Sequence, residues 1–330
     1  MRIGISLLRY IDDFLGASKV HLAELDIRLA VGLFWRFGLI LSFKKSIVWP
    51  SLRLKHLGLL IDMPTMSFMV PAEKLADLVR FALALSKKSH ASVQALQRFI
   101  GKILSLMKAV PQARLRSWSL IQDLHGHGAH VSPQEKIPLS TRSREDLAWI
   151  ASQLPSNSTA PWLIGRCRAI FTDAGPWGWS FHCPSLNDFI ASGRWSPHHQ
   201  HLDIQIREAY AVLFGLASVA DLLVRDPLPL CLFTDNASVL GYVSAQGGRK
   251  NPVMASLSFL ILHHAGELTC PIRMARWIPS AVNSIADAGS RGRSLTLPEV
   301  QLLWTDMYKK LNIGSDGLLV GDSHVHPYHL

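Results

Sequence analysis

Four acidic residues in the second half of the chain stand at the ends of elements that are otherwise apolar. Asp173 ends the run CRAIFTDAG, Glu208 lies in the opening turns of a long apolar segment, Asp235 ends PLCLFTD, and Asp287 follows VNSIA. One such acid is commonly structural, because Asp is frequent at turns and helix starts. Four of them suit another role, because carboxylates are the oxygen ligands that Mg²⁺ takes in proteins. A bound cation would also offset the cost of placing acids in apolar surroundings.

A pair of Mg²⁺ ions held by carboxylates can hydrolyse a phosphodiester, because the ions activate a water and neutralise the attacking and leaving oxygens. If the four side chains converge, they indicate a hydrolase that uses two Mg²⁺ ions, with Mn²⁺ as the alternative metal. Convergence requires a fold that brings residues 173, 208, 235 and 287 together. Each of these acids taken singly keeps its structural explanation.

The segments that carry these acids predict a mixed α/β sheet covered by helices. Alternating and continuous apolar runs predict strands, and apolar residues three and four apart predict helices. We expect strands at 167–175, 177–184, 189–197, 229–235 and 270–279, and helices at 203–224, 236–246, 252–266 and 283–292. Three strands, a helix and then strands alternating with helices are typical of such a sheet.

FTDAGPWGW, REAYAVLFGL, LFTDNASVLGYV and VNSIADAGSRG resemble, in this order, the four acidic motifs of retroelement ribonuclease H domains. The resemblance implies the ribonuclease H fold, cleavage of the RNA strand of RNA:DNA hybrids, and Asp173, Glu208, Asp235 and Asp287 as catalytic Mg²⁺ ligands. It also implies that Asp173 and Asp235 lie nearest the attacked phosphate. Arg207 departs from the family pattern, and its guanidinium is expected either to point away or to form a competing ion pair.

Two adjacent acids, Asp12 and Asp13, stand in RYIDDFLGAS between short apolar runs that predict a tight hairpin. An ordinary Asp-rich turn is one interpretation. YIDDFLG also resembles the Tyr-x-Asp-Asp motif of reverse transcriptases, which implies Asp12 and Asp13 as polymerase metal ligands. GLILSFKKSIVWP and LKHLGLLID resemble the closing elements of the palm, and the helical segments at 70–85 and 92–110 resemble the thumb.

Nine residues precede the Tyr-x-Asp-Asp motif, whereas the family carries a further catalytic aspartate and the fingers upstream. We therefore expect no independent DNA synthesis by this chain. A second polymerase chain, a missing N-terminal half and a start codon assigned too late stay open as explanations.

The chain carries a formal net charge of +10, and residues 36–116 are rich in Lys and Arg. A basic surface attracts the phosphate backbone, although a solvated helical face is the other interpretation. The residues expected to bind nucleic acid are Tyr10, Lys44, Lys45, Lys87, Lys88, Arg98 and Lys102. The expected partner is an RNA:DNA hybrid or another nucleic acid.

The predicted domains are a partial palm at 1–71, thumb helices at 72–124, a linker with a short helix at 125–163, a ribonuclease H-like domain at 164–293 and a tail at 294–330. DAGPWGW, GRWSP and NSIADAGSR resemble DIRS-type retrotransposons most, and SRGR makes hepadnavirus polymerases the second choice. No apolar run long enough to span a membrane is free of charge, so we expect an intracellular protein, nuclear or cytoplasmic. The alternative function is a decayed or domesticated protein that binds nucleic acid without catalysis.

Two histidine groups could suggest metal ligands, His125, His127 and His130 on a Gly-rich segment and His324, His326 and His329 near the end of the chain. The first group has no acidic or thiol partner nearby, so metal binding is not expected there, and the second is expected to be a solvated tail.

Overall fold

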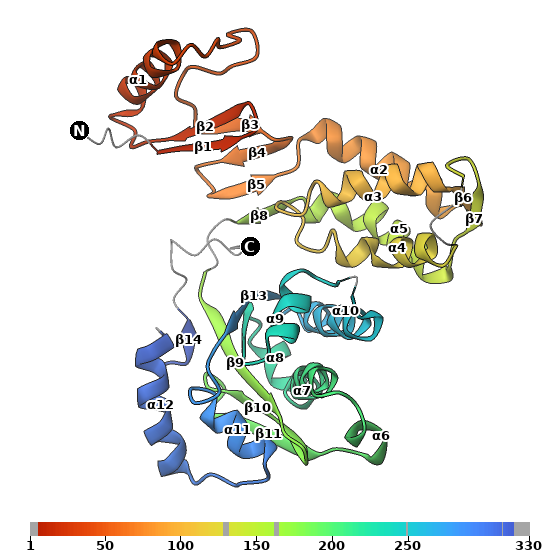
Figure 1. Cartoon of the computed structure of the whole chain (residues 1–330), viewed down its shortest axis with the longest axis vertical. Coiled ribbons are helices and arrows are strands. Elements are labelled where there is room, and N and C mark those ends of the chain that lie inside the picture. Colours follow the sequence, from red (N-terminus) through yellow and green to blue (C-terminus); the bar gives the residue numbers. More distant parts are fainter. Residues whose placement is uncertain (1–5, 128–131, 162–164, 249, 312, 320–330) are drawn as a thin grey trace.

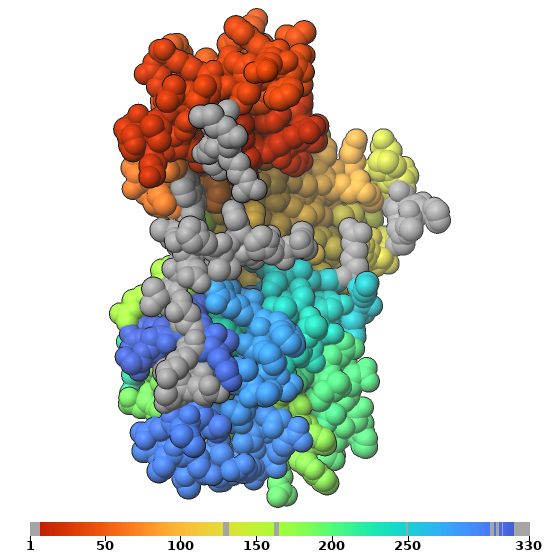
Figure 2. Space-filling view, turned by 60° about the vertical axis from the view of Figure 1, so that its left-hand side comes forward, coloured from red at the N-terminus to blue at the C-terminus, as the bar shows by residue number. Residues whose placement is uncertain are grey.

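The computed structural model describes residues 6–127, 132–161, 165–248, 250–311 and 313–319. The N-terminal elements lie at one end of the molecule, the α2–α5 helices beside them, and the C-terminal sheet with its helices at the other end (Figure 1). In the space-filling view the N-terminal part and the C-terminal part also form opposite ends (Figure 2).

The C-terminal region is built on a mixed sheet with the order β11-β10-β9-β12-β13. Its strands are β9 (Cys167–Ala174), β10 (Gly178–Cys183), β11 (Phe189–Arg194), β12 (Leu230–Thr234) and β13 (Ile272–Trp277). The first three strands are antiparallel, whereas β12 runs parallel to both β9 and β13. The predicted fold class, a ribonuclease H-like mixed sheet with flanking helices, is confirmed.

Helices cover both faces of this sheet. They are α6 (Pro197–Gln200), α7 (Ile204–Ser218), α8 (Ala220–Arg225), α9 (Ala237–Ser244), α10 (Pro252–Glu267), α11 (Ser284–Ser290) and α12 (Leu297–Leu311). Residues such as Ile170 and Phe181 pack against α7, α9 and α10 on one face. Phe171 and Phe233 pack with α11 and α12 on the other (Figure 1). Because β9 is buried on both sides, its apolar residues form a nearly continuous run.

Gly215 allows α7 to lie close to the sheet. A Cβ at this position would overlap the ring of Phe181 on β10. Any larger residue would move the helix outward, and with it Glu208, which lies two turns nearer the helix N-terminus.

The helical region contains α2 (Ala72–Ser86), α3 (Val93–Leu104), α4 (Trp118–His125) and α5 (Thr141–Gln153), with the 3₁₀ turns η1 (Leu115–Ser117) and η2 (Leu154–Asn157) and the two-stranded sheet of β6 (His90–Ser92) and β7 (Lys136–Pro138). The Ser92 side chain accepts a hydrogen bond from the Ala95 amide at 3.2 Å and caps α3. Phe99, Leu120 and Ile150 are fully buried in the shared core.

The N-terminal region has a hairpin of β1 (Ser6–Tyr10) and β2 (Asp13–Ala17), followed by α1 (Ala23–Arg36). A four-stranded sheet follows, made of β3 (Arg53–His56), β4 (Leu59–Asp62), β5 (Ser67–Met69) and β8 (Thr159–Pro161). Between residues 7 and 58 only Ala30 is buried. The hairpin and α1 therefore have almost no buried core of their own.

The segment 125–163, expected as a linker with a short helix, contributes more than a linker would. Leu147 and Ile150 of α5 are fully buried against the other helices, and β8 completes the sheet of β3–β5. The predicted helix at 203–224 is in fact two helices, because α7 ends at Ser218 and α8 begins at Ala220.

The segment 294–330, expected as a tail, also carries structure where it is described. Val300 and Met307 of α12 are buried in the sheet core, and β14 (Leu318–Leu319) pairs antiparallel with the start of β9. His324, His326 and His329 lie outside the described residues, as does His130. His125 and His127 are exposed.

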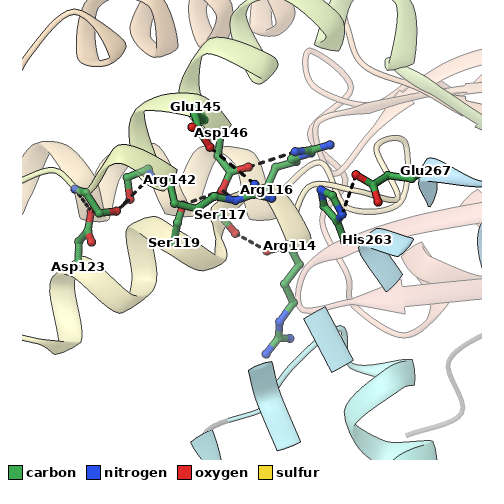
Figure 3. A network of polar contacts seen from close by, with 12 residues as sticks. Arg114, Arg116, Ser117, Ser119, Asp123, Arg142, Glu145, Asp146, His263 and Glu267 are labelled. Atoms are coloured by element: carbon green, nitrogen blue, oxygen red, sulfur yellow. Dashed lines mark hydrogen bonds and ion pairs between the residues drawn. The ribbon is translucent and has the colours of Figure 1, made fainter. Parts of the chain in front are cut away.

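The helical region meets the C-terminal region where η1 contacts α10, and Arg116 lies near His263 of α10 (Figure 3). Asp146 on α5 lies 3.2 Å from Arg116 and 3.5 Å from Arg142, and it accepts a 2.8 Å hydrogen bond from Ser119. The Arg142 guanidinium also lies 5.3 Å from the ring centroid of Phe259 on α10. A buried acid balanced by two arginines thus lies at this junction.

Among the described residues, no helix combines the length and the apolar character that crossing a membrane requires.

Candidate metal centre

Three of the predicted site residues meet at the end of the C-terminal sheet. Asp173 lies near the end of β9, Glu208 on the second turn of α7, and Asp235 directly after β12. Each offers a carboxylate oxygen, and the three oxygens lie within 4.8 Å of one another. Because β9 and β12 are parallel neighbours, their ends meet at one edge of the sheet, and α7 brings Glu208 to the same place.

Two oxygens in this cluster lack a hydrogen-bond partner. Within the described part of the chain, neither Glu208 Oε2 nor Asp235 Oδ1 is hydrogen-bonded, although both atoms are buried. Glu208 as a whole is only 6% exposed. Burying such atoms without a partner costs about 1–3 kcal/mol each, more for charged groups. A divalent cation would satisfy both, so the donor set fits a hard metal ion such as Mg²⁺.

The pKa values of Glu208 and Asp173 are raised, which means that negative charge in the cluster is unfavourable. Burial, together with the charges of Asp173 and Asp235, raises the pKa of Glu208 to about 9. Burial likewise raises the pKa of Asp173 to about 6, against a hydrogen bond from Ser290 that lowers it. A bound cation would reverse this tendency and keep the carboxylates ionised.

The fourth acid, Asp287, lies on α11 beside the cluster and outside the group of three. Its charge raises the pKa of Asp173, so the two carboxylates are near enough to interact. Arg291 binds Asp287 at 2.8 Å from the next turn of the same helix. Asp287 is therefore placed at the margin of the centre and is partly neutralised.

Three residues that the sequence did not indicate hold Asp235 and Asp173, two through a carboxylate oxygen and one through the backbone. The Ser280 hydroxyl donates a 2.6 Å hydrogen bond to Asp235 Oδ2, and the Trp277 indole N–H donates a 2.9 Å bond to the Asp235 carbonyl. The Ser290 hydroxyl donates to Asp173 Oδ2. Ser290 stands three residues after Asp287, one helical turn on, which is a signal that could have found it. Ser280 has no such signal, because its partner is 45 residues away.

The Arg207 guanidinium hydrogen-bonds to backbone carbonyl oxygens instead of to the carboxylates of the cluster. It donates to the carbonyl oxygens of Gly175 and Pro176, each at 3.2 Å, on the turn between β9 and β10. Of the two predicted arrangements, the one in which the side chain turns away from the acids is observed. Arg207 thus ties α7 to the β9–β10 turn.

Asp12 and Asp13 form the tip of the predicted hairpin, and the structure confirms the hairpin itself. Residues 11 and 12 make the turn, Ile11 has a φ of 55°, and Asp13 opens β2 opposite Tyr10. Both acids are exposed. In the described ranges, they belong to no group of three potential metal ligands, so the structure does not bring a third acid to them.

The residues expected to bind nucleic acid lie at the surface of the N-terminal and helical regions. Tyr10, Lys44, Lys45, Lys87, Lys88 and Arg98 are exposed. Lys102 is half-buried, forms an ion pair with Asp77 and lies 6.0 Å from the ring centroid of Phe81. Its charge is therefore partly balanced, and the other basic residues are the freer candidates.

No protein-family model and no curated protein matches the chain. Solved structures do. A foamy viral protease-reverse transcriptase in complex with RNA/DNA hybrid matches 84% of this chain and 36% of its own, at 14% identity and a TM-score of 0.41. The N-terminal RNase H domain of a Mycobacterium tuberculosis protein matches 38% of this chain and 98% of its own, at 16% identity and a TM-score of 0.29.

RNase H1 from Halobacterium salinarum matches 37% of this chain and 92% of its own, at 18% identity and a TM-score of 0.27. The chain spans between 36% and 55% of the length of the foamy viral proteins that it matches. Likenesses at these scores carry no functional conclusion, and the strand order of the sheet is what identifies the fold.

Proposed function

We propose that this chain is a fragment of a retroelement reverse transcriptase whose ribonuclease H-like region hydrolyses the RNA strand of RNA:DNA hybrids. The observation that carries the proposal is the cluster of Asp173, Glu208 and Asp235, whose carboxylate oxygens lie within 4.8 Å of one another. Two of the oxygens in this cluster are buried without a partner, which is unfavourable unless a cation binds there.

Asp173, Glu208 and Asp235 would hold the metal, with Asp287 at the margin. When bound, a pair of Mg²⁺ ions would activate a water and neutralise charge on the phosphodiester. The protein's own contribution is to keep the carboxylates in place. Gly215 lets α7 bring Glu208 to the sheet, and Arg207 anchors the same helix to the β9–β10 turn.

The substrate class follows from charge and from the motif resemblance. The net charge of +10 and the exposed Lys87, Lys88 and Arg98 favour a polyanion. An RNA:DNA hybrid would be distinguished by its shape and its 2′-hydroxyls rather than by its bases. The DIRS-type retrotransposon remains our assignment of the clade, on the motifs DAGPWGW and NSIADAGSR, with hepadnavirus polymerases as the second choice.

DNA synthesis by this chain alone is not part of the proposed function. Asp12 and Asp13 are exposed and have no third ligand within the described residues. A two-metal site needs carboxylates from separate strands. Incorporation of nucleotides by the isolated chain in a primer-extension assay would contradict this.

A second candidate function is a protein that binds nucleic acid without cleaving it. The ion pair between Arg291 and Asp287 favours it, because the fourth acid is then already neutralised within the chain. This candidate predicts retention of a labelled hybrid on a filter with no shortening of its RNA strand.

The deciding experiment is incubation of the chain with a hybrid labelled on its RNA strand, with Mg²⁺ and with chelator. Cleavage is expected with Mg²⁺ alone, and Asp173→Asn is expected to abolish it. Asp221→Asn is the matched control, because Asp221 is exposed on α8 of the same region. No cleavage by the unmodified chain, or equal cleavage by Asp173→Asn, would reject the proposed activity.

A further inference from the structure

The connection from β13 to α11 fixes one oxygen of Asp235. Ser280 donates to Asp235 Oδ2 at 2.6 Å, while Oδ1 of the same carboxylate is buried without a partner in the described structure. The indole N–H of Trp277, at the end of β13, donates a 2.9 Å hydrogen bond to the backbone carbonyl oxygen of Asp235. Both the main chain and one carboxylate oxygen of Asp235 are thus held from the same short segment.

Ser290 does the same for Asp173 from the end of α11. Its hydroxyl donates to Asp173 Oδ2 and lies 2.9 Å from the Asp287 carbonyl oxygen. Gly289 lets α11 lie close to β10, because a Cβ at this position would overlap the Ser180 hydroxyl. Ser180 is the strand partner of Asp173, so the close approach of α11 brings Ser290 to its target.

In the described part of the chain, the side-chain hydrogen bonds to these two carboxylates come from serine hydroxyls. A hydroxyl orients a carboxylate without neutralising it, whereas an arginine would do both. Each carboxylate therefore has one oxygen engaged by a neutral donor.

We propose that Ser280 and Ser290 are positioning residues that make Asp235 and Asp173 each present a single oxygen to the cation, and that they thereby favour Mg²⁺ over Ca²⁺. This inference rests on the proposed function, because it assigns a metal preference to the same centre. Mg²⁺ is small and takes single carboxylate oxygens in a strict octahedron, whereas Ca²⁺ accepts bidentate carboxylates and a looser shell. Occupying the second oxygen of each carboxylate disfavours the bidentate mode.

The test is calorimetric titration of the full chain, freed of metal by chelator, with MgCl₂ and separately with CaCl₂. Loss of an outer hydrogen bond to a metal ligand typically weakens affinity about 10–100-fold. In Ser280→Ala and in Ser290→Ala, we expect Mg²⁺ affinity to fall by about 10-fold or more and Ca²⁺ affinity to fall much less. The ratio of the two affinities is the readout, because general loosening of the fold would weaken both ions alike.

Ser280→Thr is the conservative variant, because it keeps the hydroxyl donor and is expected to keep the ratio. Ser218→Ala is the matched control, since Ser218 is exposed on α7 and its hydroxyl donates to the Gly215 carbonyl within that helix. Ser280 is exposed, so Ser280→Ala keeps the test intact if the buried Ser290→Ala variant does not fold.

An unchanged Mg²⁺ to Ca²⁺ ratio in folded Ser280→Ala would overturn the inference while leaving the proposed function in place. Absence of Mg²⁺ binding by the unmodified chain would overturn both. A lowered ratio in Ser280→Ala that Ser280→Thr restores would support the assignment.

Discussion

Asp146 and Glu208 are both buried carboxylates, but their surroundings differ. Asp146 lies between Arg116 and Arg142 and accepts a hydrogen bond from Ser119 (Figure 3). Glu208 lies beside two further acids and has a buried oxygen with no partner in the described structure. The charge of Asp146 is balanced by the chain itself, whereas burial of Glu208 beside two acids is favourable only when a proton or a bound cation neutralises it.

The N-terminal hairpin adds a third case. Asp12 and Asp13 are adjacent in sequence, yet they are exposed and water solvates both. Adjacency in the chain is therefore a weaker sign of a metal centre than convergence of distant acids on a buried edge. The contrast predicts large effects of substitutions at the buried acids and small effects at the hairpin.

The largest effect is expected on cleavage. Glu208→Gln and Asp235→Asn each remove a proposed metal ligand, so each should lower the rate of hybrid cleavage by more than about 100-fold, beyond the loss of an outer-shell contact. Asp12→Asn combined with Asp13→Asn should leave the rate within about 2-fold, because surface substitutions away from a site are nearly neutral. Quantitative gel analysis of the labelled RNA strand measures both. An equal loss of cleavage rate in the hairpin variant and in the variants of the buried acids would contradict the distinction between the two regions.

Asp146→Asn should destabilise the chain by about 2 kcal/mol, below the usual range for breaking a buried ion pair, because Arg142 is partly exposed. Arg116, whose side chain is 17% exposed, would lose its counter-charge. The loss in free energy of unfolding, measured by urea denaturation, should be the same with and without Mg²⁺. A Mg²⁺-dependent loss would show that Asp146 is coupled to the metal centre.

The pH dependence of the free energy of unfolding should reveal the raised pKa of Glu208. Because the folded-state pKa of Glu208 is raised from 4.5 to about 9, its protonated form stabilises the fold at low pH, and this contribution is lost as the pH rises toward 9. In chelator, the unmodified chain should lose at least about 1 kcal/mol more than Glu208→Gln between about pH 6 and about pH 9. Thermal melts at both pH values measure the difference, and added Mg²⁺ should remove most of it.

The smallest effect is expected at the hairpin. Asp12→Asn combined with Asp13→Asn should change the free energy of unfolding by less than about 0.5 kcal/mol, because both side chains are exposed. A Mg²⁺-dependent change in its urea midpoint would contradict the description of this pair as solvated.

The sequence predicted the elements of the C-terminal sheet well, because β9 and β12 are apolar runs that end at acids. It also predicted that Asp173, Glu208, Asp235 and Asp287 converge, and the structure groups the first three and leaves Asp287 outside the group. It did not predict α12 or β14, because no motif marked 294–330 and a two-residue strand leaves no periodicity.

The contacts of Ser280 could not be predicted either. Its hydroxyl meets Asp235 only because β13 lies beside β12 in the sheet, so the pair depends on strand order rather than on local pattern. The same holds for the segment 125–163, whose polar stretch suggested a linker although α5 within it supplies buried Leu147 and Ile150.

The most direct test of the metal centre is a Mn²⁺ titration followed by electron paramagnetic resonance, since bound Mn²⁺ loses the signal of the free ion. We predict that the unmodified chain and the Asp12→Asn, Asp13→Asn variant bind Mn²⁺ alike, and that Asp173→Asn loses this binding. Retention of full binding by Asp173→Asn, or its loss in the hairpin variant, would contradict a metal centre built on the buried acids.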